Sequence, residues 1–390
     1  MIKSKVPNIK TSIFAIMSSM AQEYNAINLS QGFPNFEISK ELISLVNKSM
    51  LAGHNQYAPM AGVLSLRKKL SLKAEKLYGK KYNPETEITI TAGGTQALHS
   101  TISTIIKEGD EVLIFEPAYD SYAPVVKLNG GRPVYVKLKY PNFSIDWEEV
   151  NKLVNSKTRL IILNSPHNPS GKVFSDADMQ SLKRLVIGTK ILILSDEVYE
   201  HIIFDGHKHN SVAKYPELID RSILVFSFGK MYHATGWKIG YCMAPEAIMK
   251  EIRKVHQFVV YAANTPIQYA IAEYLDKEEE YLQLSSFYQK KRDYFNSLLT
   301  EIGFELTPAS GTYFQTVNFS AYSDETDFQL AERLTKKYGI AAIPMSSFYH
   351  NEENSGTLRF CFAKTDKMLA DAAEKLANFH KDAKKQLNLF

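Results

Sequence analysis

KILILSDEVY, residues 190–199, is the stretch of sequence that indicates the fold most clearly. Its apolar residues, 191–194, follow one another without alternating with polar ones. A short unbroken apolar run is typical of a strand that is buried on both faces of a mainly parallel sheet. Polar residues begin at Ser195 and Asp196, where this strand is expected to end. Because ligands bind at the carboxyl ends of the strands in such sheets, we expect a functional site at this end.

Similar runs occur on both sides of this stretch and alternate with helical patterns. The strand-like runs are EITITAG (87–93), DEVLIFEP (110–117), RLIILNSP (159–166) and SILVFSF (222–228). The helical patterns between them are GTQALHSTISTIIKEG (94–109), YDSYAPVVKLNGG (119–131) and DADMQSLKRLVIG (176–188). This alternation predicts an α/β fold with a doubly wound, mainly parallel sheet. We expect this large domain to span residues 36–275.

The pattern changes after Tyr274. A long amphipathic helix is expected next, with an acidic start and a basic middle that suit the helix dipole. Shorter strand-like runs then alternate with two further helical patterns. These elements predict a smaller α+β domain, built from residues 276–390 together with an N-terminal arm, residues 1–35.

The composition is that of an ordinary globular protein: 390 residues, 45% hydrophobic and 23% charged. The net charge of +4 comes from lysines scattered along the whole chain, which argues against a nucleic-acid stripe or a polybasic membrane patch. The N-terminal stretch lacks the apolar core of a signal peptide, so we expect a cytoplasmic protein. Cys242 and Cys361 lie in apolar runs and are expected to be buried thiols, with no metal cluster.

Two lysines stand out in SFGKMYHATGWKIGY, residues 227–241. A lysine among apolar neighbours loses hydration, which favours its neutral, nucleophilic amine. The alternative is a surface lysine that extends its ammonium into water, and for either residue alone this is the simpler interpretation. The segment therefore suggests a catalytic amine at Lys230 or Lys238 without deciding between them.

Two loops after strands could hold polar parts of a ligand. TAGGTQAL, residues 91–98, places two glycines between a strand and a helix, where backbone N–H groups can bind an anion such as phosphate. A tight turn would explain the same residues. NSPHNPSG, residues 164–171, is a turn rich in Asn, Pro and Gly, and it places the amide of Asn168 at a ligand-facing strand end.

Charged side chains occur in two further apolar segments. Asp196 could cap a following helix, and Tyr199, one helical turn further on, could then face the same crevice. Arg359 lies inside the apolar run TLRFCFA (357–363) and needs an anionic partner, either a structural acid or a substrate carboxylate. Together, an amine nucleophile, a carboxylate and an anion cup are what an enzyme needs to use pyridoxal phosphate.

The same motifs, taken in order, carry a family resemblance. SFGKMYHATGWKIGY, ILNSPHNPSGKVF, LSDEVYEHI, LSQGFPNF, NQYAPMAG and LRFCFA resemble the motifs of class I aminotransferases of fold type I. The most similar group is that of the bacterial methionine aminotransferases and the kynurenine–oxoglutarate (glutamine K type) transaminases. The similarity covers residues 14–379, nearly the whole chain.

This resemblance implies roles residue by residue, in a homodimer with shared active sites. Lys230 matches the lysine that binds pyridoxal phosphate as a Schiff base, and Asp196 and Tyr199 complete the catalytic set. The implied cofactor-binding residues are Gly94, Thr95, Tyr119, Asn168, Asp196, Tyr199, Ser227, Lys230, Lys238 and Tyr57, the last reaching the phosphate of the neighbouring subunit. The implied substrate-binding residues are Gly32, Asn168, Arg359, Phe14 and Phe33, with Tyr57, Tyr119 and Phe348 as further candidates for the side-chain pocket.

The implied reaction is a ping-pong transfer of an amino group to a 2-oxo acid. No second arginine is evident for a distal carboxylate, so we expect an apolar or aromatic donor: methionine first, then phenylalanine, tyrosine, leucine, glutamine or kynurenine. The flexible thioether of methionine suits an irregular aromatic pocket. The alternatives are a pyridoxal-phosphate β-lyase that cleaves cysteine S-conjugates and a non-catalytic regulator that binds the cofactor.

Overall fold

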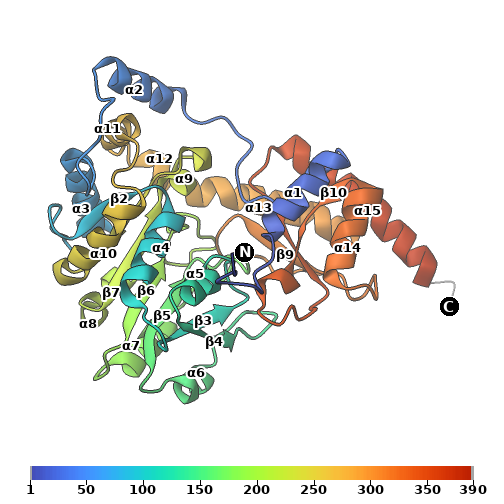
Figure 1. Ribbon diagram of the computed structural model, residues 1–390. Coiled ribbons are helices and arrows are strands. Elements are labelled where there is room, and N and C mark those ends of the chain that lie inside the picture. Colours follow the sequence, from blue (N-terminus) through green and yellow to red (C-terminus); the bar gives the residue numbers. More distant parts are fainter. Residues whose placement is uncertain (1, 388–390) are drawn as a thin grey trace.

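The computed structural model describes residues 2–387 and is built around one seven-stranded sheet (Figure 1). The strand order is β2-β8-β7-β6-β5-β3-β4, and only β8 runs antiparallel to its neighbours. The strands are β2 (Ile88–Thr91), β3 (Glu111–Glu116), β4 (Arg132–Lys137), β5 (Thr158–Asn164), β6 (Leu192–Asp196), β7 (Ser222–Ser227) and β8 (Gly240–Met243). The expected doubly wound, mainly parallel sheet is confirmed.

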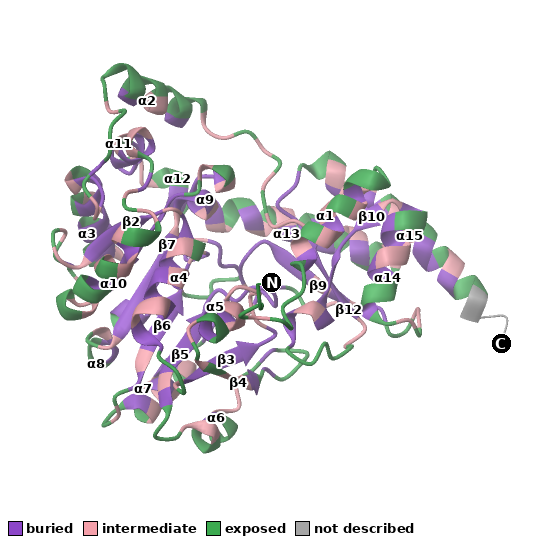
Figure 2. Ribbon diagram, in the orientation of Figure 1, coloured by how far each residue is buried: buried purple, intermediate pink, exposed green. Residues whose placement is uncertain are grey.

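Successive residues of the central strands enter different hydrophobic clusters, one on each face of the sheet. In β5, Ile161 packs into one cluster, and Leu160 and Ile162 pack into the other. This explains why the apolar runs do not alternate with polar residues. Figure 2 shows these strands as buried and the surrounding helices as exposed on their outer sides.

Helices cover both faces of the sheet. One face carries α4 (Gly94–Ile105), α5 (Tyr122–Leu128) and α10 (Glu246–Val259). The other carries α3 (Leu64–Tyr78), α6 (Trp147–Leu153) and α7 (Asp176–Val186). The helices α2 (Lys40–Leu51) and α11 (Thr265–Tyr274) contact each other, and α8 (Pro216–Ile219) and α9 (Phe228–Met231) are single turns beside β7.

Strand β4, at the edge of the sheet, was not predicted from the sequence. This strand pairs only with β3, and Arg132 and Lys137 at its two ends are exposed. Pro133 lacks a backbone donor, which an edge strand tolerates because one side has no neighbour. The mixed polar pattern that hid β4 is therefore a consequence of its edge position.

A smaller α+β part packs beside the large sheet. It contains the sheet β11-β12-β9 and a parallel pair in which β1, near the N-terminus, binds β10. Its strands are β1 (Ile27–Asn28), β9 (Phe314–Asn318), β10 (Ile340–Ala341), β11 (Ile343–Pro344) and β12 (Thr357–Cys361). Its helices are α1 (Ile13–Glu23), α13 (Leu284–Ile302), α14 (Asp327–Arg333) and α15 (Asp366–Leu387). The short helix α12 (Glu279–Leu282) lies beside α11 and packs on the large part, where the Lys73 amine of α3 lies over the ring of Tyr281 (Figure 1). The domain boundaries expected at residues 36 and 275 stay a prediction.

Both cysteines, Cys242 and Cys361, are buried as free thiols. None of the helices within residues 2–387 is both long enough and apolar enough to cross a membrane.

Candidate active site

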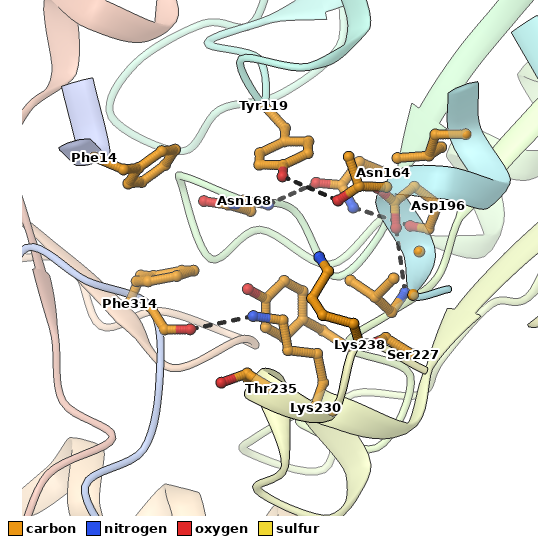
Figure 3. Close-up of a pocket in the computed structure, with 18 of the residues that line it drawn as sticks. Phe14, Tyr119, Asn164, Asn168, Asp196, Ser227, Lys230, Thr235, Lys238 and Phe314 are labelled. Atoms are coloured by element: carbon orange, nitrogen blue, oxygen red, sulfur yellow. Dashed lines mark hydrogen bonds between the residues drawn. The ribbon is translucent and has the colours of Figure 1, made fainter. Parts of the chain in front are cut away.

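A cavity of about 220 Å³ lies where three parallel strands end (Figure 3). Asn164, Asp196 and Ser227 are the last residues of β5, β6 and β7, and all three line it. The smaller part of the molecule closes the cavity with side chains from β9 and β12. The structure brings these predicted site residues together in its lining: Phe14, Gly32, Gly94, Thr95, Tyr119, Asn168, Asp196, Tyr199, Ser227, Lys230, Lys238 and Arg359.

One end of the cavity is rich in hydrogen-bond donors. The helix α4 begins at Gly94, so its first-turn N–H groups have no acceptors within the helix. Gly93 precedes it with a φ of +84°, a conformation that disfavours residues with a side chain. A Cβ at position 93 would come within 3.6 Å of the Lys238 amine, so loop and ammonium face the same space. This combination can bind a doubly charged phosphate.

Lys230 projects its amine into the middle of the cavity from α9 (Figure 3). The nitrogen donates hydrogen bonds to the carbonyl of Gly32 at 3.1 Å and to the hydroxyl of Tyr313 at 2.7 Å. Burial lowers the pKa of this amine to about 8. A substantial fraction is therefore neutral near physiological pH, as a nucleophile or general base requires.

Asp196 provides a buried acid that has no cationic hydrogen-bond partner within residues 2–387. Its Oδ2 accepts a hydrogen bond from the Tyr122 hydroxyl at 2.7 Å. Burial raises the pKa of the carboxyl to about 6. An N–H⁺ group placed beside this oxygen pair would offset the cost of ionising it.

The expectation of a helix after Asp196 is wrong. Residues 198–201 form turns, and the Asp196 carboxylate caps no helix. Tyr199 nevertheless lines the same cavity. Its ring meets that of Tyr313 edge to face, with a centroid separation of 5.2 Å.

Arg359 is a fully buried cation without an acid. Its Nη1 donates to Oδ1 of Asn168 at 2.7 Å and its Nη2 donates to the carbonyl of Ser30 at 2.9 Å. The buried Nε has no partner, and no carboxylate oxygen within the described chain lies within 4.0 Å of the guanidinium. The alternative of a structural acid partner is therefore excluded for residues 2–387, and the cation remains available for a carboxylate in the cavity.

The family follows from comparison with known proteins. Residues 24–376 match the model of the family "Aminotransferase class I and II". The chain belongs to the family of class I and II aminotransferases. A methionine aminotransferase of Escherichia coli is 46% identical over 96% of this chain and 97% of its own. A kynurenine–oxoglutarate transaminase of Dictyostelium discoideum is 35% identical over 95% of this chain and 94% of its own.

Solved structures agree with this assignment. A crystal structure of an Escherichia coli protein with a methionine aminotransferase function has a TM-score of 0.94 and 46% identity. The match covers 97% of this aminotransferase and 99% of that chain. The expected fold type I architecture and transaminase activity are thereby confirmed.

Three predicted residues do not line the cavity of the aminotransferase. Phe33 is 42% exposed, and its ring lies 4.5 Å from the Lys364 amine, so within one subunit it does not reach the cavity. Tyr57 is 85% exposed and contacts Tyr261, so within one subunit it contributes nothing to the site. Phe348 is buried behind the lining, with its ring 5.1 Å from the Arg359 guanidinium.

Four residues of the aminotransferase site were not predicted from the sequence. Tyr122 holds Asp196, and Asn164 fixes the Asn168 turn by accepting the backbone N–H of Asn168 at 2.7 Å. Both lie within stretches quoted above, 119–131 and 164–171, so their position next to predicted site residues could have identified them. Tyr313 binds Lys230, and the Phe314 ring lies 3.8 Å from the Arg359 guanidinium. These two carry no motif that separates them from ordinary strand aromatics.

Proposed function

We propose that this aminotransferase uses pyridoxal phosphate to move the amino group of a neutral amino acid, methionine first, to a 2-oxo acid. The observation that carries this proposal is the unpaired guanidinium of Arg359, which lines the same cavity as the Lys230 amine. A buried cation without an acid costs free energy until an anion binds to it. A substrate α-carboxylate is the anion that would also bring Cα close to the amine.

The lining fits the cofactor at three separate points. The amine of Lys230 can bind the aldehyde carbon, and the carboxyl of Asp196 can accept the pyridine N–H. The start of α4, with Ser227 and Lys238, can bind the phosphate. Tyr119 lies opposite the two lysines in Figure 3 and offers a ring face to the pyridine. Asn168 and Tyr199 can donate to the ring oxygen.

When bound, pyridoxal phosphate supplies a protonated ring that withdraws electrons from the substrate Cα. Lys230 would accept the proton from Cα and donate it to the former aldehyde carbon of the cofactor, and its pKa of about 8 suits both steps. Asp196 keeps the ring nitrogen protonated. Arg359 and Asn168 hold the carboxylate so that the Cα–H bond points at Lys230.

The cavity wall favours a donor with a neutral side chain. Phe14 and Phe314 line it and flank Arg359, whose guanidinium lies 5.2 Å and 3.8 Å from their ring centroids. Arg359 is the only arginine among the described residues of the lining. A dicarboxylic donor would therefore lack a second arginine for its distal carboxylate, whereas a thioether packs well against aromatic rings. The name of the 46% identical relative supports methionine independently.

A donor screen tests this function. Purified protein loaded with pyridoxal phosphate is mixed with L-methionine and a 2-oxo acid, and formation of the new amino acid is followed. We expect kcat/KM for methionine to exceed that for aspartate by at least about 100-fold, because a distal carboxylate would be buried unpaired. Equal activity with aspartate contradicts the donor class. Oxo-acid release from cysteine conjugates without any acceptor indicates a β-lyase, and binding without turnover indicates a regulator.

We further propose a homodimer. Large apolar side chains are exposed near α2 and the end of α10, and they include Leu51, Tyr57 and Phe258, which are 90%, 85% and 87% exposed. The segments meet, since the ring of Tyr57 contacts that of Tyr261 and the hydroxyl of Thr265 donates to the carbonyl of Gln56. Large apolar side chains that are exposed on segments in contact with each other are typical of an interface between subunits.

Phe258→Glu is expected to convert the dimer into monomers and to weaken cofactor binding. A charge placed in an apolar interface costs several kcal/mol, because it must be buried on association. Light scattering gives the mass, and titration with pyridoxal phosphate gives Kd. Ile187→Glu is the control, since Ile187 is also exposed, at 53%, but lies at the end of α7. A wild-type chain that is monomeric at micromolar concentration overturns the dimer.

A further inference from the structure

Three groups form a closed hydrogen-bonded triangle beside the cavity. The Lys230 amine donates to the Tyr313 hydroxyl at 2.7 Å and to the Gly32 carbonyl at 3.1 Å. The Tyr313 hydroxyl donates in turn to the same carbonyl at 2.5 Å. The Lys230 nitrogen also lies 5.3 Å from the ring centroids of both Tyr199 and Tyr313. Two oxygens and two ring faces therefore stabilise the ammonium in this position.

The position of Tyr313 is set by the backbone around it. The N–H of Thr312 donates to the carbonyl of Ile202 at 2.9 Å, and the N–H of Phe362 donates to the carbonyl of Tyr313 at 3.0 Å. These bonds join the segment to the turns after β6 and to the end of β12. Tyr313 itself has no exposed surface. Its hydroxyl is thus presented to Lys230 by a fixed element.

The carbonyl of the triangle belongs to the loop that also holds the carboxylate clamp. Ser30, two residues before Gly32, accepts a hydrogen bond from Arg359. A Cβ at position 32 would lie only 2.7 Å from the ring of Phe314, whose face stacks on Arg359. The residue at position 32 must therefore be glycine for the loop to approach both partners. The lysine and the clamp are held by one short segment.

We propose that Tyr313 and the Gly32 carbonyl form a docking position for the Lys230 amine whenever it is not bonded to the cofactor. Tyr313 is then a positioning residue: it keeps the freed amine beside the substrate Cα while Arg359, held by the same loop, fixes the carboxylate. This inference rests on the proposed function, because a freed amine exists only if Lys230 bonds to and leaves the cofactor. It assigns a role to a residue that no sequence motif identified.

The first test uses cofactor-free protein and measures the pH dependence of Lys230 acylation by acetic anhydride, quantified by peptide mass spectrometry. Tyr313→Phe removes one acceptor from the ammonium, so the midpoint is expected to fall by about one pH unit from the wild-type value. Tyr288→Phe is the matched control. The Tyr288 hydroxyl is buried without a hydrogen-bond partner in the described chain, and its ring centroid lies 5.6 Å from that of Tyr313.

The second test uses enzyme loaded with pyridoxal phosphate. Tyr313→Phe is expected to lower kcat about tenfold with little change in KM, because the base is less well positioned while the carboxylate clamp is intact. Tyr288→Phe is expected to match the wild type. If both variants give the wild-type midpoint and kcat in a protein that turns over, the docking position is wrong and the proposed function stands. A wild type that binds no cofactor overturns both.

Discussion

Lys230→Ala is expected to lower kcat by more than about 10⁴-fold, which is the largest effect that this account predicts. The variant loses the only amine near the centre of the cavity within residues 2–387, and this amine acts both as nucleophile and as proton carrier. Transfer from methionine is measured at saturating cofactor and substrates. Restoration of part of the rate by added methylamine would show that an amine is the missing group.

Lys238→Ala is the informative contrast, because the two lysines are eight residues apart and line the same cavity. Lys238 lies beside the start of α4, so its loss is expected to raise the Kd for pyridoxal phosphate about 10- to 100-fold. Saturating cofactor should recover far more turnover in this variant than in Lys230→Ala. Near-wild-type turnover of Lys230→Ala would show that the roles are assigned wrongly.

Asp196→Asn is expected to lower kcat/KM about 10³-fold and to stabilise the cofactor-free protein at neutral pH. The first effect follows because an amide cannot keep a pyridine nitrogen protonated. The second follows from burial, which raises the pKa of this carboxyl from the usual 3.8 to about 6. Above pH 6 the folded, cofactor-free chain carries a disfavoured charge at a cost of up to about 3 kcal/mol.

The raised pKa of Asp196 determines how the stability of the folded protein changes with pH. Between pH 3.8 and about 6 the folded state holds a proton that the unfolded chain has released, so this group lowers stability as the pH rises. Above about pH 6 the loss of folding stability caused by the buried charge is constant, and below pH 3.8 this loss disappears. The advantage of Asp196→Asn should therefore grow from pH 4.5 to pH 7, as measured by urea unfolding without cofactor.

Asp327→Asn is the control for Asp196→Asn, because Asp327 is also buried and burial also raises its pKa. It binds Ser346 outside the active-site lining, so its loss is expected to change stability with turnover within about threefold of wild type. If Asp196→Asn is destabilised at pH 7 while turning over normally, both its buried charge and its role are wrong.

Unbroken apolar runs were sufficient to predict the central strands, because residues buried on both faces have no polar alternation to obscure them. Strand β4 was not predicted for the opposite reason, since an edge strand keeps polar and exposed residues. Asp196 and Lys230 could be found because each follows such a run directly. Tyr313 could not, because its contact with Lys230 joins residues 83 positions apart and depends on how the two sheets meet.

The aromatic residues of the pocket also show that sequence alone does not decide which side chains enter the cavity. Phe33 and Phe14 looked alike in the sequence, yet Phe14 lines the cavity and Phe33 lies against Lys364. The difference depends on where the two elements lie in the fold, since Phe14 belongs to helix α1 and Phe33 to the loop after Gly32. Tyr57 would reach a site only in the proposed homodimer, so its role cannot be judged from one chain.

The most direct test of the account is reduction with borohydride. Protein purified with excess pyridoxal phosphate is reduced, digested and analysed by mass spectrometry for a pyridoxyl group. We expect the label on Lys230 in nearly every subunit, with none on Lys238. A colourless protein that yields no labelled Lys230 peptide, or a label distributed over surface lysines, would contradict the central claim.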